Sequence, residues 1–220
     1  MSAFEGKRSR HNRIRDWDEA WRRGRPPWET PEVNGDLQRV VIARRQELRK
    51  AAFLELGCGT GREAVWLATQ GFQVTAIDAS VTAIERARTR AEQADALLRI
   101  VLSDVFSFAR HGETFDFVYD IGFYHYIRRT DLKRYLDLLW EMTHPGAYYF
   151  TVCGAAELDT KSELGPPTAS VADIRWEIGR LFEVVEIVPC RLGSPYVEEG
   201  FPAHACLLRR PVVGRSSGRN

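Results

Sequence analysis

The apolar positions of the chain fall into two patterns that alternate along it. Short apolar runs predict buried strands at residues 51–56, 74–78, 96–102, 115–120, 147–153, 182–189 and 204–209. Apolar residues at helical spacing predict helices from residue 12, at 36–49, just after residue 61, and at 81–94, 130–142 and 171–181. Alternating strands and helices predict a parallel sheet covered by helices on both faces. No helix separates the last two strands, so we expect the seventh strand to be antiparallel.

We expect this sheet to form a single domain, because neither an internal repeat nor a linker divides the chain. Residues 1–11 are polar and predicted to be disordered, residues 12–50 to form a lid and a helix of the main domain, residues 51–210 to form the ligand-binding core, and residues 211–220 to be a flexible tail. The segment 154–169 contains Pro and Gly and is long for a connector, which indicates a functional loop.

Three alternating glycines follow the first predicted core strand, at Gly57, Gly59 and Gly61. A strand, a glycine loop and a helix together let a ligand approach the backbone and the helix N-terminus without meeting a Cβ atom. A tight turn without a ligand is the alternative, but it needs fewer glycines. Residues 59–64 also fit the dinucleotide pattern G-x-G-x-x-A, with Asp78 about 20 residues further on, so an NAD-dependent oxidoreductase is one interpretation.

Glu55 distinguishes this loop from a dinucleotide fingerprint, because a carboxylate inside the strand gives a dinucleotide site no advantage. The register Glu55-x-Gly57-x-Gly59-x-Gly61, followed by a strand that ends in Asp78, resembles the first motif of the class I S-adenosylmethionine-dependent methyltransferases. That resemblance implies a single-domain, doubly wound, seven-stranded Rossmann-like α/β sheet with an antiparallel last strand and an N-terminal helical lid. It also implies S-adenosyl-L-methionine as cofactor and S-adenosyl-L-homocysteine as product.

The same resemblance implies roles for the loop and for the ends of the next two strands. The three glycines would let the amino-acid and ribose parts of the donor approach the main chain, and Glu55 would order the loop or contact the donor's amino group. Asp78, with Ala79, would bind the ribose hydroxyls, and Asp104 with Val105 would hold the adenine. From the residues alone, Asp78 is also a candidate helix cap, although Ser80 is available for that role, and Asp104 is also an ordinary turn aspartate.

The N-terminal segment carries three tryptophans in a short distance. The spacing Trp17-x-x-x-Trp21-x-x-Gly24, followed by Trp28, resembles the start of the thiopurine methyltransferase-like group. The resemblance implies that this segment lies over the cofactor and lines the acceptor pocket, with Trp17, Trp21 and Trp28 at the donor and Trp28 also at the acceptor. The alternative is that these rings cap the core from outside.

The fourth strand ends in a second aromatic motif, residues 119–126, where the resemblance places the acceptor and the reactive methyl group. We expect Asp120 at the donor, a flat apolar acceptor pocket formed by Phe123, Tyr124 and Tyr126, and His125 as a candidate catalytic residue that orients the acceptor or removes its proton. The alternative is that the aromatic rings belong to the core and the histidine is structural. The related group often has Asp-Arg-Gly here, and Ile121 in place of the arginine argues against an anionic thiol acceptor.

Composition narrows the function further. The net charge of +1 argues against a nucleic-acid partner, and no apolar stretch is long enough to span a membrane. The four cysteines form no metal or disulfide pattern, which predicts no metal and buried thiols in a cytoplasmic protein, either monomer or homodimer. The sequence therefore predicts methyl transfer to an O, N or S atom of a small molecule, and an aromatic compound is one candidate. The alternatives are the oxidoreductase and a non-catalytic nucleotide-binding regulatory protein of the same fold.

Overall fold

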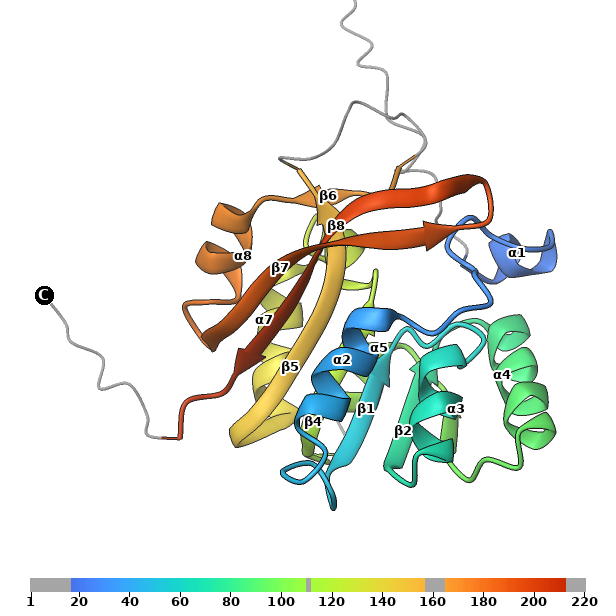
Figure 1. Ribbon diagram of the computed structural model, residues 1–220, viewed down its shortest axis with the longest axis horizontal. Coiled ribbons are helices and arrows are strands. Elements are labelled where there is room, and N and C mark those ends of the chain that lie inside the picture. Colours follow the sequence, from blue (N-terminus) through green and yellow to red (C-terminus); the bar gives the residue numbers. More distant parts are fainter. Residues whose placement is uncertain (1–16, 110–111, 157–164, 213–220) are drawn as a thin grey trace, which may run out of the picture.

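The computed structural model describes residues 17–109, 112–156 and 165–212 (Figure 1). Its helices are α1 (Trp17–Arg22), α2 (Gly35–Ala43), α3 (Arg62–Thr69), α4 (Val81–Gln93), α5 (Val105–Phe108), α6 (Tyr124–Ile127), α7 (Leu132–Glu141) and α8 (Val171–Glu177). Its strands are β1 (Ala52–Leu56), β2 (Gln73–Asp78), β3 (Arg99–Leu102), β4 (Phe115–Ile121), β5 (Thr143–Ala155), β6 (Thr168–Ala169), β7 (Glu183–Ser194) and β8 (Val197–Arg209).

All the strands belong to one sheet in the order β3-β2-β1-β4-β5-β8-β7, with the short β6 paired to β5. The pairs from β3 to β5 are parallel, whereas β8 runs antiparallel to both β5 and β7. This arrangement confirms the predicted α/β fold class and its antiparallel last strand, and β6 adds an eighth strand. The strand order reverses beside β1, and ligands of open α/β sheets bind at such a point, outside the carboxyl ends of the strands.

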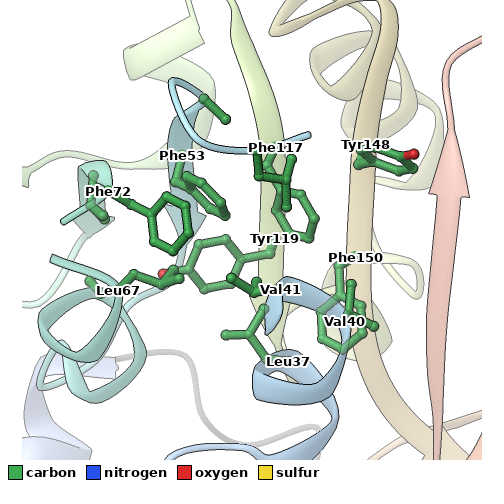
Figure 2. Close-up of a cluster of buried hydrophobic side chains, with 14 of the residues drawn as sticks. Leu37, Val40, Val41, Phe53, Leu67, Phe72, Phe117, Tyr119, Tyr148 and Phe150 are labelled. Carbon is green, nitrogen blue, oxygen red and sulfur yellow. The ribbon is translucent and has the colours of Figure 1, made fainter. Parts of the chain in front are cut away.

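Buried side chains fill both faces of the sheet. Figure 2 shows one of the two clusters, in which Phe53 and Phe117 stack with ring centroids 4.9 Å apart and which also contains Val40 and Val41 of α2. The other face packs against α7 and α8, with Leu139 and Ile174 fully buried. Apolar residues at helical spacing thus produce the layers that the sequence predicts. Within the described ranges, no helix is long and apolar enough to cross a membrane.

Side-chain caps fix where several helices begin. The Ser80 side chain accepts a hydrogen bond from the Ala83 N–H at the start of α4, and Asn34 does the same for the Leu37 N–H of α2. Ser170 and Asp173 form a reciprocal capping box on α8. The cap on α4 matters for the site, because it leaves Asp78, two residues earlier, available for another role.

Several predicted boundaries are corrected by the structure. The helix expected at 36–49 ends at Ala43, and the third strand begins at Arg99 instead of residue 96. The last two strands extend toward each other into the long β7–β8 hairpin, where the sequence predicted a loop. The predictions for residues 1–11, for the helix start at 12–16, for most of the tail and for the middle of the 154–169 segment lie outside the described residues.

Candidate active site

The glycine loop joins β1 to α3 in a left-handed backbone conformation. Gly57 has φ +67° and Gly59 has φ +54°, values that side-chain-bearing residues rarely adopt. A Cβ atom on Gly57 would lie 2.7 Å from the Phe123 ring, and one on Gly59 would lie 3.1 Å from the Trp21 ring. Two aromatic rings therefore pack directly on the loop, which gives these glycines a role within the protein as well as toward a ligand.

The third glycine, Gly61, lies against helix α4 instead of an aromatic ring. A Cβ atom there would lie 3.0 Å from the Cβ of Ala87 on α4, so this glycine permits α3 and α4 to pack closely. The sequence places Gly61 in the donor motif, and the structure adds a packing reason for it.

Asp78 holds the loop from the end of β2. Its Oδ2 accepts a hydrogen bond from the Gly59 N–H at 2.8 Å, and its Oδ1 accepts one from the Ser80 N–H at 2.8 Å. Burial raises the pKa of Asp78, and these backbone donors oppose that rise. Because each carboxylate oxygen accepts two hydrogen bonds, Asp78 retains capacity for a pair of hydroxyl groups.

Two buried carboxylates lie behind the loop. Glu55 is 2% exposed and its Oε2 accepts a hydrogen bond from the Tyr119 hydroxyl at 3.1 Å, a contact set by the pairing of these two residues across β1 and β4. Burial, reinforced by the charge of Glu63, raises the pKa of Glu55 well above its ordinary value. Glu55 therefore supports the loop from within the core.

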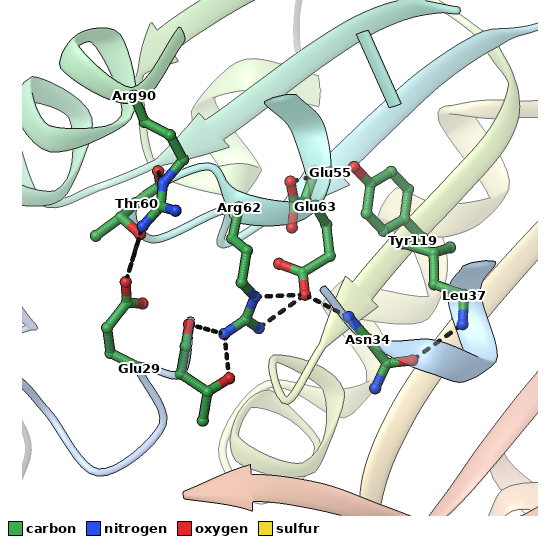
Figure 3. Close-up of polar contacts among 10 residues, drawn as sticks. Glu29, Asn34, Leu37, Glu55, Thr60, Arg62, Glu63, Arg90 and Tyr119 are labelled. Atoms are coloured by element: carbon green, nitrogen blue, oxygen red, sulfur yellow. Dashed lines mark hydrogen bonds and ion pairs between the residues drawn. The ribbon is translucent and has the colours of Figure 1, made fainter. Parts of the chain in front are cut away.

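The segment from residue 17 to residue 34, here called the strap, crosses over the glycine loop. Figure 3 shows Arg62 of α3 paired with Glu63, whose carboxylate accepts the Asn34 N–H at 3.2 Å. Arg62 also donates to the Thr30 carbonyl at 2.7 Å. In the same way, Glu29 accepts from the hydroxyl of Thr60, inside the loop, at 2.7 Å.

Further contacts fix the first part of the strap to α4. Asp18 accepts from the Ser80 hydroxyl at 2.7 Å and from the Thr82 N–H at 2.8 Å, and these bonds lower the pKa of Asp18 to about 2. Arg86 donates to the Trp21 carbonyl at 2.9 Å. On the other side, the hydroxyl of Tyr196 in the β7–β8 hairpin donates to the Arg25 carbonyl at 2.9 Å.

Four aromatic rings meet where the strap contacts α6, and we call them the aromatic wall: Trp17, Trp21, Trp28 and Tyr126. Trp17 meets Tyr126 edge to face with centroids 5.0 Å apart and meets Trp28 at 5.6 Å, while Trp21 and Trp28 are 6.1 Å apart. Trp21 is buried, and the other three rings are half-buried. The structure thus brings together the two aromatic motifs that the sequence singled out.

Of the aromatic residues that follow β4, some lie at the aromatic wall and the glycine loop, and others are buried in the core. Phe123 and Tyr126 lie at the site, whereas Tyr124 is fully buried and its hydroxyl donates to Glu177 at 2.6 Å. The Asp120 carboxylate is also fully buried and accepts from five protein groups. The structure does not bring Tyr124 or Asp120 to the surface where a ligand would lie, because internal partners hold both side chains.

His125 is 2% exposed, and its Nδ1 accepts a hydrogen bond from the Gly154 N–H at 3.1 Å. The neutral ring therefore carries its proton on Nε2, where it donates and does not accept. Burial raises the pKa of the neighbouring Tyr126 to about 12, so its phenol stays protonated at neutral pH. Neither side chain is set up as a general base in this arrangement.

Asp104 and Val105, predicted at the adenine, follow β3, and Ala79, predicted beside Asp78 at the ribose, follows β2. The Asp104 side chain is exposed, and its Oδ1 caps α5 by accepting from the Phe106 N–H at 3.1 Å and the Ser107 N–H at 3.0 Å. Val105 is buried and Ala79 is exposed. Asp104 is thus a helix cap here, with Oδ2 not used in that cap.

Sequence reasoning did not single out the side chains that attach the strap: Asp18, Glu29, Arg62, Glu63, Arg86 and Arg90. The only indication in the sequence was that two charged residues, Arg62 and Glu63, directly follow the last glycine of the loop. Their partners in the strap lie about 30 residues earlier, so the sequence did not show which residues they would bind. Within the described part of the chain, no cluster of three or more His, Cys, Asp or Glu side chains could hold a metal ion.

Comparison with known proteins agrees with this geometry. Residues 53–146 match the protein family described as "Methyltransferase domain". The chain is 24% identical over 169 residues to the 2-heptyl-1-hydroxyquinolin-4(1H)-one methyltransferase of Mycobacteroides abscessus, covering 76% of this chain and 73% of that protein. It is 37% identical over 70 residues to the thiopurine S-methyltransferase of Gluconobacter oxydans, covering 32% of this chain and 31% of that one.

Among solved structures, the N-methyltransferase NodS of Bradyrhizobium japonicum WM9, in complex with S-adenosyl-L-homocysteine, superposes with a TM-score of 0.62 at 20% identity, covering 90% of this chain and 94% of NodS. The match of fold, motif and sequence favours the methyltransferase interpretation over an oxidoreductase or a non-catalytic protein. Together, the methyltransferase domain at residues 53–146, the methyltransferase relatives and the fold support a class I, S-adenosylmethionine-dependent methyltransferase.

Proposed function

We propose that this enzyme methylates a small, planar aromatic molecule bound against the aromatic wall. The observation that carries the proposal is the meeting of Trp17 with both Trp28 and Tyr126, with ring centroids 5.6 Å and 5.0 Å apart, beside the glycine loop. Aromatic side chains in contact with one another form a broad apolar surface, and pockets for small molecules are lined mainly by such groups.

The donor would lie on the glycine loop, with Asp78 bonding to its ribose hydroxyls and Asp104 with Val105 near its adenine. When bound, S-adenosylmethionine supplies a methyl group already activated by the positive sulfur. The protein's part is then to align the acceptor and to exclude water. Trp21 and Phe123, which pack on the loop, would form the border between the two ligands.

The strap would serve as a lid over both ligands. Apart from the buried Trp21, its contacts with α3, α4 and the β7–β8 hairpin are mainly hydrogen bonds and ion pairs. Such contacts exchange with water more readily than a packed core does. A lid held in this way can open for ligand exchange while the sheet remains folded.

The side chains around the wall favour an acceptor that needs little help in losing a proton. Tyr126 has its pKa raised to about 12, and His125 uses Nδ1 to accept from Gly154. Heteroaromatic thiols and hydroxyls can carry their proton on a ring nitrogen instead, so the neutral molecule offers its sulfur or oxygen to the methyl group without prior deprotonation. The two relatives are named as methyltransferases of a hydroxyquinolinone and of thiopurines, which are heteroaromatic molecules of this kind, and these names support the proposed acceptor class. Ile121, where the related group often has an arginine, supplies no cation for an ionised acceptor and so fits a neutral ring system.

Methyl transfer to three probes tests the proposal: 2-mercaptopyridine, 4-hydroxyquinoline and the saturated cyclohexanethiol, with product mass as readout. We expect methylation of at least one planar probe and a marked preference for it over cyclohexanethiol. Tyr126→Ala should raise the KM of that acceptor about fivefold, because a well-packed aromatic contact contributes about 1 kcal/mol. Trp176→Ala is the matched control, since that ring is 73% exposed on α8. Equal use of planar and saturated thiols would contradict the proposal.

A further inference from the structure

The most heavily bonded side chain near the site is a carboxylate that no ligand can reach. Asp120 is 0% exposed at the end of β4. Its Oδ2 accepts from the Tyr149 hydroxyl at 2.7 Å and lies 3.2 Å from the Tyr135 hydroxyl. Its Oδ1 accepts from the Thr151 hydroxyl at 3.1 Å. Buried carboxylates are costly unless they are bonded, and this one is bonded on all sides.

The remaining two donors link Asp120 to the site. Oδ1 also accepts from the backbone N–H of Phe123 at 2.8 Å and from that of Tyr124 at 3.0 Å. These two groups begin the single turn of α6, whose backbone has few hydrogen bonds of its own because it is four residues long. One side chain therefore sets the direction in which this turn leaves the sheet.

The turn carries two aromatic side chains, Phe123 and Tyr126, that contact the glycine loop and the strap. The Phe123 ring lies against Gly57, and Tyr126 lies edge to face on Trp17. A change in the direction of the turn would move both rings, one relative to the glycine loop and one relative to the strap. A short helix that presents two rings to different partners depends on how its first backbone groups are held.

We propose that Asp120 is a positioning residue for acceptor binding: it fixes the turn of α6 so that Phe123 and Tyr126 complete the acceptor site. The proposal rests on the function proposed above, in which the acceptor binds at the aromatic wall. It assigns to Asp120 an indirect role in place of the donor contact expected from the sequence.

Three substitutions distinguish a positioning role of Asp120 from a general contribution of its hydrogen bonds to the stability of the fold. Asp120→Ala removes the bonds to the turn and to the core together. Asp120→Asn is the conservative variant, because its oxygen can still accept from the turn while its amide group donates to the tyrosine oxygens, whose hydroxyls can rotate. Tyr149→Phe is the matched control, since it removes a bond to the same carboxylate on the core side and leaves the bonds to the turn intact.

The first readout is the dissociation constant of 2-mercaptopyridine, measured by calorimetry in the presence of saturating S-adenosyl-L-homocysteine. Asp120→Ala should weaken binding of this probe about tenfold or more, with affinity for S-adenosyl-L-homocysteine within about threefold of wild type. Asp120→Asn and Tyr149→Phe should bind the probe within about threefold of wild type. Equal weakening by Asp120→Ala and Tyr149→Phe, or a parallel loss of affinity for both ligands, would overturn the proposal. Asp120→Ser, which keeps one acceptor for the turn, replaces the alanine variant if that variant does not fold.

Hydrogen exchange of the peptide that spans residues 121–128 is the second readout and needs no acceptor. Exchange there should speed up about tenfold in Asp120→Ala and remain near the wild-type rate in Tyr149→Phe. If wild-type protein binds no planar probe, the proposed function fails, yet exchange still decides whether Asp120 fixes the turn. Unchanged exchange at 121–128 in a folded Asp120→Ala protein would overturn the positioning role.

Discussion

Replacing Gly59 with alanine tests how the glycine loop, the strap and the donor depend on one another. Gly59 has φ +54°, and an added Cβ would lie 3.1 Å from the Trp21 ring, closer than ordinary van der Waals contact. Gly71 is the matched control, because it has φ +85° but nothing within 4 Å of the added Cβ. Both substitutions thus carry the cost of a left-handed alanine, and only Gly59→Ala also displaces a ring.

The expected magnitudes follow from these two terms. A left-handed alanine costs about 1–2 kcal/mol, and the less flexible unfolded chain returns about 0.4–1 kcal/mol of that. Gly71→Ala should therefore lower the free energy of unfolding by about 1 kcal/mol. Gly59→Ala should lower it by a further 1 kcal/mol or so, because Trp21 is 2% exposed and has little room to move.

Donor binding should separate the two variants more clearly than stability does. Gly59→Ala places a methyl group at the loop and shifts Trp21, so its affinity for S-adenosyl-L-homocysteine should fall at least about tenfold, equivalent to about 1.4 kcal/mol. Gly71→Ala should bind within about twofold of wild type. The assays are urea unfolding and calorimetric titration of the three proteins. Equal affinities in Gly59→Ala and Gly71→Ala would refute the reasoning that the loop meets the donor.

Three further predictions concern single side chains. Asp78→Ala should weaken binding of S-adenosyl-L-homocysteine by about 1.5–3 kcal/mol, measured by calorimetry, because hydroxyls would lose a charged partner; unchanged affinity would place the ribose elsewhere. His125→Asn keeps an acceptor for the Gly154 N–H, so we expect a raised acceptor KM and a kcat within about tenfold of wild type; a loss of about 10²–10⁴ in kcat would instead identify a general base. The pKa of Asp18 is lowered from 3.8 to about 2, so its stabilisation of the strap is present above about pH 4 and is lost as pH falls toward 2. Tryptophan emission should shift to the red over that range, and the shift should be smaller in Asp18→Asn; identical transitions would argue that the strap is released by another group.

Local motifs made much of the site predictable from the sequence. The register of Glu55 and the glycines, the acid at the end of β2 and the placement of the tryptophans each depend on a few adjacent residues. The choice between Asp78 and Ser80 as cap of α4 was resolved in favour of Ser80, as its position directly before the helix indicated.

Contacts between distant segments account for what the sequence did not reveal. Residues 123–126 read as a uniform aromatic run, but a single helical turn points its side chains in different directions, and Glu177, 53 residues away, holds Tyr124 inside. Asp120 likewise meets Tyr149 at a separation of 29 residues. The outer part of the β7–β8 hairpin was not predicted because it contains Pro189, Gly193, Gly200 and Pro202, residue types that are typical of turns and loops.

The central claim is that one site holds the donor on the glycine loop and a planar acceptor on the aromatic wall. A crystal structure of the enzyme with S-adenosyl-L-homocysteine and 2-mercaptopyridine tests it most directly. The account predicts the donor product with its ribose at Asp78 and the pyridine ring in contact with Trp28 and Tyr126, its sulfur facing the sulfur of the donor product. A ring bound away from these two side chains, or a donor product away from Gly59, would contradict the account.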